Sequence, residues 1–215
     1  MTKLKICGAR TQEDFHLINT SSADYVGFIF AKSKRQVTPQ TVKQWIPDDR
    51  KSLLVGVFVD PTVMEVQEVL EEVDLDVLQL HGTESITFIK DLKVRTGKEI
   101  WKALSHSERT LDEMEIYVDV VEGFVIDTKV NGRTGGTGVR FDWKAIPSYT
   151  HFAKKHNKLC FIAGGLTAKN VQECLGYGPI GIDLSSGVER DEAKSETEIT
   201  KLIERMNAHA YGISR

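Results

Sequence analysis

The sequence has no apolar run that approaches the roughly 20 residues of a membrane-spanning helix. Residues 1–5 also lack the long apolar stretch of a secretory signal. The three cysteines (Cys7, Cys160 and Cys174) are an odd number and form no Cys-x-x-Cys pair, so the sequence predicts neither a disulfide framework nor a zinc knuckle. We therefore expect a cytoplasmic protein without a membrane partner.

The sequence also lacks a large excess of charge of either sign. Its 28 basic and 31 acidic side chains give a net charge of -3, so no broad positive surface is available for nucleic acid and we expect no such partner. The common nucleotide-binding fingerprints, GxGxxG or GxxxxGK[ST] directly after an early strand, do not occur in the sequence. With 40% hydrophobic and 27% charged residues, the composition is that of an ordinary globular domain.

Eight short apolar segments are each followed by a segment with helical features. The predicted strands cover residues 4–7, 25–30, 53–59, 77–80, 100–104, 124–126, 159–163 and 180–184. Strands that alternate with helices predict a parallel sheet. Eight consecutive units without a break in composition predict a single (β/α)8 TIM barrel over residues 1–215. A doubly wound open sheet is the alternative, but it predicts a nucleotide fingerprint that the sequence lacks.

Capping residues indicate where several of the helices begin. Proline follows two of these caps at the first helical position, where it is well tolerated. The predicted helices extend to residues 19, 45, 70, 93, 117, 155, 175 and 210. The predicted caps are Thr11, Thr38, Asp60, Asp142, Thr167 and Ser195.

Chemically reactive side chains stand where predicted strands end, and the active site of this fold lies at those carboxyl ends. Cys7 ends the first strand, Asp127 ends the sixth and Asp183 lies near the end of the eighth. Gln79 and His81 share one face at the end of the fourth strand. A single histidine there is more often a packing residue than a metal ligand, and no second histidine with carboxylates accompanies it. We therefore predict no metal.

Small residues follow the seventh and eighth strands, in the two loops that usually hold phosphate in this fold. They are Gly164 and Gly165 after the seventh strand, and Ser186 and Gly187 after the eighth. Glycines can simply turn the chain after a strand. Their presence in both loops favours backbone N–H groups that close on an anion, and hence a phosphorylated small-molecule substrate.

The role of Cys7 is open between two interpretations. Free cysteines are commonly core residues. A thiol can instead be a base when nearby positive charge lowers its pKa below about 8.5, and Lys5 lies on the same face of the strand. Arg35, in a basic loop after the second strand, is either part of a solvated charged run or a bidentate partner for a carboxylate.

Ten or so polar residues with four glycines follow Asp127, within residues 128–138. Such a segment packs poorly, and it is either an exposed loop or a mobile lid over the predicted site. We favour the lid, because it follows a carboxylate at the end of a strand.

The assembled motifs resemble the phosphoribosylanthranilate isomerase family, the barrel enzymes of tryptophan biosynthesis. These motifs occur in the same order as in the family and span nearly the whole chain. Each motif alone is weak evidence, and only their combination is specific. The matching pieces are residues 5–8 (KICG), 27–30 (GFIF), 33–35 (SKR), 79–82 (QLHG), Asp127, 135–138 (GGTG), 141–143 (FDW), 164–166 (GGL) and 183–189 (DLSSGVE).

The resemblance implies a TIM barrel of the ribulose-phosphate-binding type and an Amadori rearrangement of N-(5'-phosphoribosyl)anthranilate without a cofactor. It implies Cys7 as general base, Asp127 as general acid and Arg35 as partner of the anthranilate carboxylate. Gln79, His81 and Asp183 are then further substrate-binding candidates, in a monomer or a homodimer. In one departure, Ala193 precedes Lys194 where the family usually has a glycine.

Two other functions remain as alternatives. A metal-dependent sugar-phosphate epimerase would need several histidines and carboxylates at adjacent strand ends, and these are missing. A non-catalytic phosphate-binding barrel would keep the glycines but would not need Cys7 and Asp127.

Overall fold

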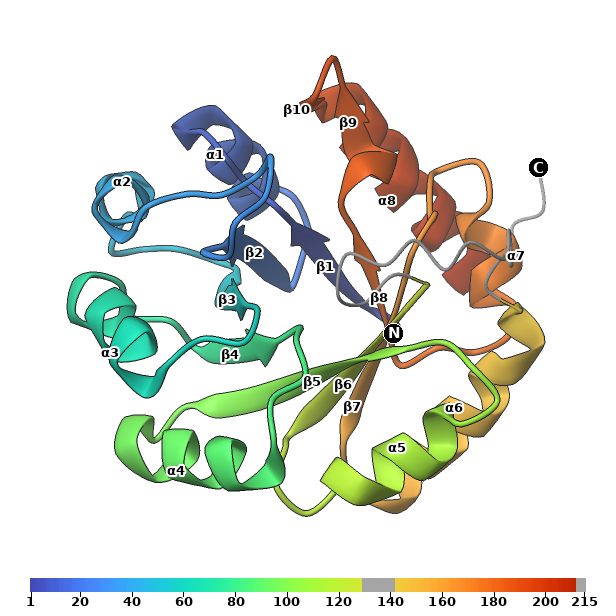
Figure 1. The fold of residues 1–215 in the computed structure, drawn as a ribbon. Helices are drawn as coiled ribbons and strands as arrows, with labels where there is room; N and C mark the ends of the chain where they lie inside the picture. Colours follow the sequence, from blue (N-terminus) through green and yellow to red (C-terminus); the bar gives the residue numbers. More distant parts are fainter. Residues whose placement is uncertain (129–141, 212–215) are drawn as a thin grey trace.

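Eight parallel strands form a closed ring with helices around it (Figure 1). The structure is a computed structural model, and it describes residues 1–128 and 142–211. The strands are β1 (Lys3–Cys7), β2 (Tyr25–Ile29), β3 (Leu53–Phe58), β4 (Val77–Leu80), β5 (Glu99–Ser105), β6 (Gly123–Asp127), β7 (Leu159–Ala163) and β8 (Gly181–Leu184). The helices are α1 (Gln12–Thr20), α2 (Pro39–Trp45), α3 (Val63–Glu72), α4 (Ile86–Thr96), α5 (Thr110–Tyr117), α6 (Ile146–Lys155), α7 (Val171–Leu175) and α8 (Glu196–Ala210). The predicted (β/α)8 barrel is confirmed.

The ring closes between the first and the last strand. Each strand pairs in parallel with the next one along the chain, and β1 also pairs with β8. In this register Lys5 lies beside Tyr25 of β2 and beside Asp183 of β8. Because all eight strands run the same way, their carboxyl ends meet at a single mouth.

Three aromatic side chains fill the inside of the barrel. The ring centroids of Trp101 and Phe161 are 4.8 Å apart, and those of Tyr25 and Trp101 are 4.9 Å apart. Glycines make room for them, because a Cβ at Gly123 would lie 2.9 Å from Trp101 and one at Gly181 would lie 2.6 Å from Phe161. This packing confines the open space of the barrel to its mouth.

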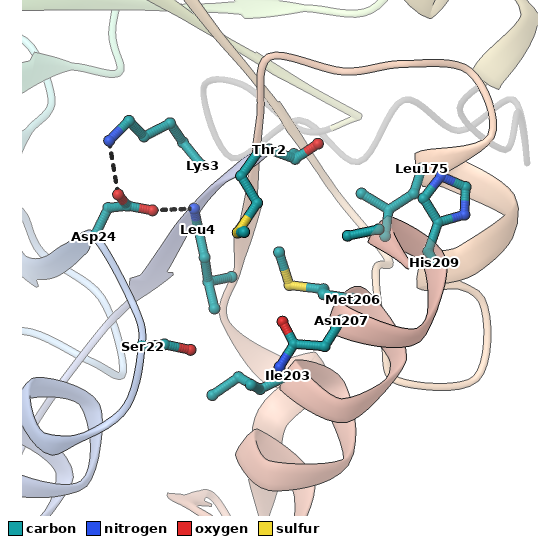
Figure 2. A pocket seen from close by; sticks show the side chains of 12 residues that line it. Thr2, Lys3, Leu4, Ser22, Asp24, Leu175, Ile203, Met206, Asn207 and His209 are labelled. Atoms are coloured by element: carbon teal, nitrogen blue, oxygen red, sulfur yellow. Dashed lines mark hydrogen bonds and ion pairs between the residues drawn. The ribbon is translucent and has the colours of Figure 1, made fainter. Parts of the chain in front are cut away.

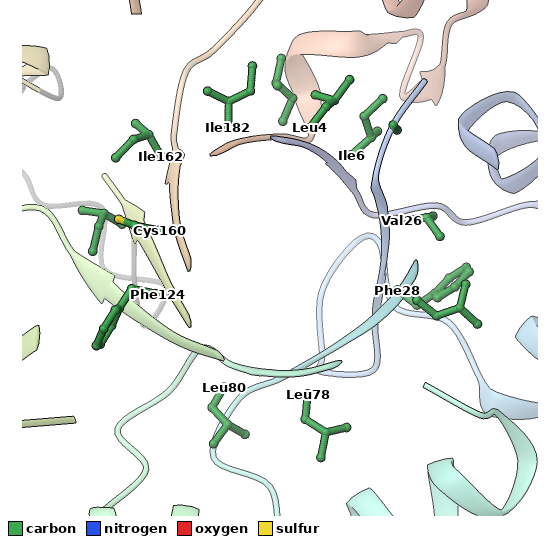
Figure 3. Packing of buried hydrophobic residues seen from close by; sticks show 14 of the residues in the cluster. Leu4, Ile6, Val26, Phe28, Leu78, Leu80, Phe124, Cys160, Ile162 and Ile182 are labelled. Carbon is green, nitrogen blue, oxygen red and sulfur yellow. The ribbon is translucent and has the colours of Figure 1, made fainter. Parts of the chain in front are cut away.

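A second apolar layer lies between the strands and the helices. Side chains such as Leu4, Ile6 and Phe28 point away from the ring of strands (Figure 3), and each is at most 2% exposed. Each buried side chain of this size contributes roughly 1.5–3 kcal/mol. Cys160 and Cys174 belong to this layer, and burial raises the pKa of each thiol to about 12.

Most of the predicted helix caps are confirmed. The side chains of Thr11, Thr38 and Ser195 each accept a hydrogen bond from a backbone N–H in the first turn of α1, α2 and α8. Asp142 caps a 3-10 turn, η1 (Trp143–Ala145), which leads directly into α6. The predicted ends of α2 at residue 45 and of α8 at residue 210 are also confirmed.

The predicted cap at Asp60 is wrong. Helix α3 begins at Val63, because Thr62 and Glu65 form a reciprocal capping box. Asp60 instead adopts a φ of 45° and accepts hydrogen bonds from the N–H and the hydroxyl of Thr83. It therefore ties the loop after β3 to the loop after β4.

The predicted start at Thr167 is also wrong. Helix α7 begins at Val171, after a turn in which the N–H of Thr167 donates to Asn170 Oδ1 at 2.8 Å. After β8 the chain forms a second 3-10 turn, η2 (Ser186–Val188), and a hairpin of β9 (Glu189–Arg190) and β10 (Ala193–Lys194). The predicted lid falls largely on residues 129–138, outside the described residues.

Candidate functional site

The carboxyl ends of the strands surround a cavity of about 350 Å³, a size that suits a small ligand. All ten site residues predicted from the sequence line it, although they come from six strand units. They are Cys7, Arg35, Gln79, His81, Asp127, Gly164, Gly165, Asp183, Ser186 and Gly187.

A buried charge pair lies at the Cys7 side of the cavity. Lys5 Nζ donates to Asp183 Oδ2 at 2.7 Å, and both side chains are almost fully buried. The Lys5 ammonium is also close enough to Cys7 to act electrostatically on its thiol. Burial alone would lower the pKa of Lys5, but the neighbouring Asp183 outweighs this and raises it, so Lys5 stays charged.

The Cys7 thiol is less acidic than an ordinary cysteine. Burial raises its pKa above the usual value, and the ammonium groups of Lys5 and Lys194 only partly offset this effect. This direction is opposite to the fall in pKa that a role as base was expected to need, because the sequence shows the charges but not the loss of water around the thiol. The raised pKa favours the protonated form of the thiol.

The opposite side of the cavity carries Asp127, His81 and Gln79. His81 Nε2 lies 3.9 Å from Asp127 Oδ2, and His81 Nδ1 lies 3.1 Å from Gln79 Nε2. Gly164 has a φ of 93°, and a Cβ there would come within 2.9 Å of Asp127 Oδ1. The glycine thus lets the loop after β7 approach the carboxylate closely.

The two predicted phosphate loops touch one another. A Cβ added to Gly187 would lie only 1.7 Å from the carbonyl oxygen of Leu166, so η2 packs directly on the backbone that follows Gly165. Small residues in both loops therefore leave backbone groups exposed to the same cavity.

Buried polar atoms without partners face this region. Among the described residues, Gln79 Oε1, Asp183 Oδ1 and Ser185 Oγ are buried and have no hydrogen-bond partner. Buried polar groups are usually satisfied. All three residues line the cavity, so a polar ligand there would satisfy them.

Arg35 reaches the cavity from the loop after β2, but it is held by a residue that sequence reasoning missed. Its Nε and Nη2 donate to the two carboxylate oxygens of Glu189 at 2.8 and 2.7 Å. Burial alone would raise the pKa of Glu189, but hydrogen bonds from Arg35 and Lys194 lower it to about 2. Glu189 belongs to the family motif at 183–189, yet no local pattern indicates its partner, which lies 154 residues away.

A second missed cluster lies behind the loop after β4. Lys102 Nζ donates to the carbonyls of Leu80 and Gly82 and to Glu84 Oε2, at 3.4, 2.8 and 3.0 Å. Glu84 Oε1 accepts from the N–H groups of Asp60 and Gly82, both at 3.0 Å. The side chain of Lys102 lies near the mouth but does not line the cavity. It supports the loop that carries His81.

Another cavity, of about 610 Å³, opens at the other end of the barrel, between the start of β1 and α8 (Figure 2). Lys3 and Asp24 form an ion pair at its edge at 2.7 Å, and Met206 lies on the α8 side. It contains none of the predicted site residues.

Neither a metal centre nor a membrane span is found in the part of the chain that the structure describes. Within residues 1–128 and 142–211, no three or more His, Cys, Asp or Glu side chains are grouped so that they could hold a metal ion. None of the helices in the same ranges combines the length and the apolarity that crossing a bilayer requires.

Comparison with known proteins points to one family. Residues 4–205 match the family model described as N-(5'phosphoribosyl)anthranilate (PRA) isomerase. The enzyme of that name from Bacillus velezensis is 44% identical, over 99% of this chain and 98% of its own length. The Bacillus subtilis enzyme is also 44% identical, over 96% and 95% of the two chains.

Solved structures agree with this result. A crystal structure of phosphoribosyl anthranilate isomerase from Thermotoga maritima superposes with a TM-score of 0.79, at 31% identity, over 97% of this chain and 100% of that one. A phosphoribosyl anthranilate isomerase in complex with reduced 1-(o-carboxyphenylamino)-1-deoxyribulose 5-phosphate has a TM-score of 0.77 at 29% identity, with the same coverage. Family model, relatives and barrel agree over nearly the full length, and the chain belongs to the N-(5'-phosphoribosyl)anthranilate isomerase family.

Proposed function

We propose that Cys7 and Asp127 carry out the proton transfers of the reaction that defines this family. The chain converts N-(5'-phosphoribosyl)anthranilate to 1-(2-carboxyphenylamino)-1-deoxy-D-ribulose 5-phosphate, a step of tryptophan biosynthesis. The observation that carries the residue assignment is that all ten predicted site residues line one cavity.

Asp127 is the general acid. It protonates the oxygen of the furanose ring, the bond between this oxygen and C1 breaks, and the open sugar is left as a protonated imine of the anthranilate nitrogen. The carboxylate suits this role because it ends β6 at the cavity, close to His81 Nε2. A positioned acid of this kind contributes about 10²–10⁴-fold to the rate.

Cys7 is the general base. It removes the proton from C2, which gives an enolamine, and the enolamine tautomerises to the ketone. All atoms of the substrate remain in the product, so the rearrangement needs no cofactor. Because burial raises its pKa, the thiolate of Cys7 is scarce at neutral pH but strongly basic when it forms. Lys5 and Lys194 provide the positive charge that stabilises it.

The two glycine loops hold the phosphate. Gly164 and Gly165 follow β7, Ser186 and Gly187 follow β8, and the loops pack on each other at the cavity. The net charge of the protein is close to zero, so a phosphate must be held by local groups. The exposed backbone N–H groups of these loops suit that anion.

The other four residues orient the rest of the substrate. Glu189 occupies Nε and one hydrogen of Nη2 in Arg35, so a second edge of the guanidinium remains for the carboxylate of the anthranilate ring. Gln79 and Asp183 each present a buried oxygen without a partner within the described residues, which suits the sugar hydroxyls. His81 lies next to the acid.

The cytoplasm is the proposed compartment, because all three cysteines are free and buried. The proposed assembly is a monomer or a homodimer. A similar chain from Thermotoga maritima is described as a monomeric form generated from a dimeric enzyme.

The decisive experiment follows the loss of substrate fluorescence during turnover by the wild type and two variants. Asp127→Asn and Cys7→Ser should each lower kcat by about 10²–10⁴-fold and leave KM nearly unchanged, because both keep the shape of the side chain. Iodoacetamide should inactivate the enzyme, and a bound product analogue should protect it. Near-wild-type kcat for Cys7→Ser would remove the thiol from the mechanism and make His81 the next candidate base.

A further inference from the structure

One lysine on the hairpin after β8 connects three parts of the site. The side chain of Lys194, on β10, is fully buried. Its Nζ donates to the carbonyl of Cys7 at 2.7 Å, to the carbonyl of Ser185 at 3.0 Å and to Glu189 Oε1 at 2.8 Å. These acceptors use all three hydrogens of the ammonium group.

The three acceptors belong to three different functions. Cys7 is the proposed base, Ser185 begins the second phosphate loop, and Glu189 holds Arg35 through two short hydrogen bonds. The hairpin itself is anchored, because the N–H of Lys194 donates to the buried Asp14 of α1 at 2.9 Å.

We propose that Lys194 is a positioning residue of this isomerase. Its ammonium group sets the orientation of the Glu189–Arg35 pair that grips the substrate carboxylate and fixes the backbone of Cys7 in the same cavity. The proposal rests on the function proposed above, because the grip and the base are assigned there.

Lys194 is buried with its charge, and all three of its acceptors are parts of the site. Taking an ammonium group out of water is costly, and an apolar side chain of similar size would fill the same space. Burial lowers the pKa of Lys194, and the Glu189 carboxylate opposes this shift. The charge lies behind Cys7 and Arg35, because Nζ donates to the Cys7 carbonyl and to the carboxylate that holds Arg35.

The first test does not need the substrate. The charged groups that act on the Cys7 thiol are Lys5 of β1, Asp183 of β8, Lys194 of β10 and Arg35. An opposite charge at close range shifts a pKa by about one unit or more. Lys194→Met should therefore slow the alkylation of Cys7 by iodoacetamide by about tenfold at pH 8, measured by mass spectrometry of the Cys7 peptide.

Lys34→Met is the matched control. Lys34 Nζ bonds Glu192 Oε1 at 2.8 Å, so this lysine–glutamate pair also joins the loop after β2 to the hairpin, but both side chains are exposed. The control should change neither the alkylation rate nor kcat/KM by more than about twofold, because exposed pairs contribute little.

The second test is a double-mutant cycle in kcat/KM. Lys194→Met and Arg35→Met should each cost about 100-fold, because misplacing a binding group by about 1 Å has this effect. Together they should cost far less than the product of the two losses, because both act on one grip. If Lys194→Met does not fold, Glu189→Gln can replace it in the cycle with Arg35→Met, because the glutamine keeps the shape of the carboxylate.

The two proposals fail in different ways. If the wild type does not turn over phosphoribosylanthranilate, the proposed function is wrong, and the alkylation rate still reports on Lys194. If the wild type is active while Lys194→Met, although less heat-stable, keeps wild-type alkylation and kcat/KM within about twofold, Lys194 is only structural. Fully multiplicative losses in the cycle would also overturn the positioning role.

Discussion

Alanine at Gly165 tests the phosphate site with a single methyl group. Gly165 has a φ of 69°, and an added Cβ would meet no atom within 4 Å. The substitution therefore causes no clash, but it strains the backbone by about 1–2 kcal/mol, because L-residues disfavour this region. In a chain of this size, each kcal/mol lowers Tm by about 2–4 °C.

The added methyl group should affect binding separately from stability. It occupies open space beside the cavity, where the phosphate must approach the backbone of the loop after β7. Loss of one hydrogen bond to a charged group costs about 1.5–3 kcal/mol, so KM should rise about 10- to 150-fold. The kcat should change little, because the phosphate is remote from C1 and C2.

Gly97→Ala separates the two effects. Gly97 caps α4 with a φ of 65°, and a Cβ there also meets nothing within 4 Å, so the backbone strain is the same but the site is distant. The Tm of both variants should fall by a similar amount, as measured by circular dichroism. Only Gly165→Ala should show a raised KM in the fluorescence assay. An unchanged KM for Gly165→Ala, at the same loss of Tm, would place the phosphate elsewhere.

Three further predictions concern proton transfer, the carboxylate and the fold. Because burial raises the pKa of Cys7, the thiolate fraction grows with pH, and the rate at which iodoacetamide alkylates Cys7 should rise about tenfold per pH unit across neutral pH; a plateau already at pH 7 would contradict this. Arg35→Met should weaken the binding of product analogues that carry the ortho-carboxylate but not the binding of ribulose 5-phosphate, as measured by calorimetry. Equal losses of affinity for both ligands would assign Arg35 to the phosphate. Lys102→Met breaks a buried pair with Glu84 and should lower the free energy of unfolding in urea by about 3–5 kcal/mol, whereas Lys3→Met at an exposed pair should cost less than about 1 kcal/mol.

The sequence by itself determined the barrel and the composition of its mouth. Eight apolar segments alternating with capped helices leave few other architectures, because parallel strands need helical crossovers. The fold then brings the residues at strand ends together, so chain order alone places Cys7, Asp127 and the glycine pair at 164–165 around one cavity. These predictions depend on local periodicity and chain order, which the sequence displays directly.

Only the tertiary structure decided how the charges pair. Arg35 meets Glu189 across 154 residues, Lys194 meets the carbonyl of Cys7 across 187, and Lys5 meets Asp183 across 178. Such contacts arise from closure of the ring, and no local pattern encodes them.

The same is true of the Cys7 pKa and of the role of Asp60. The pKa of Cys7 depends on how much water the folded cavity removes from the thiol, and that loss outweighs the nearby ammonium groups. Asp60 looks like a helix cap in the sequence, but the neighbouring loop supplies Thr83 as its partner. In both cases the local sequence does not show the cause, which is loss of water in the folded cavity for Cys7 and the loop of the next strand unit for Asp60.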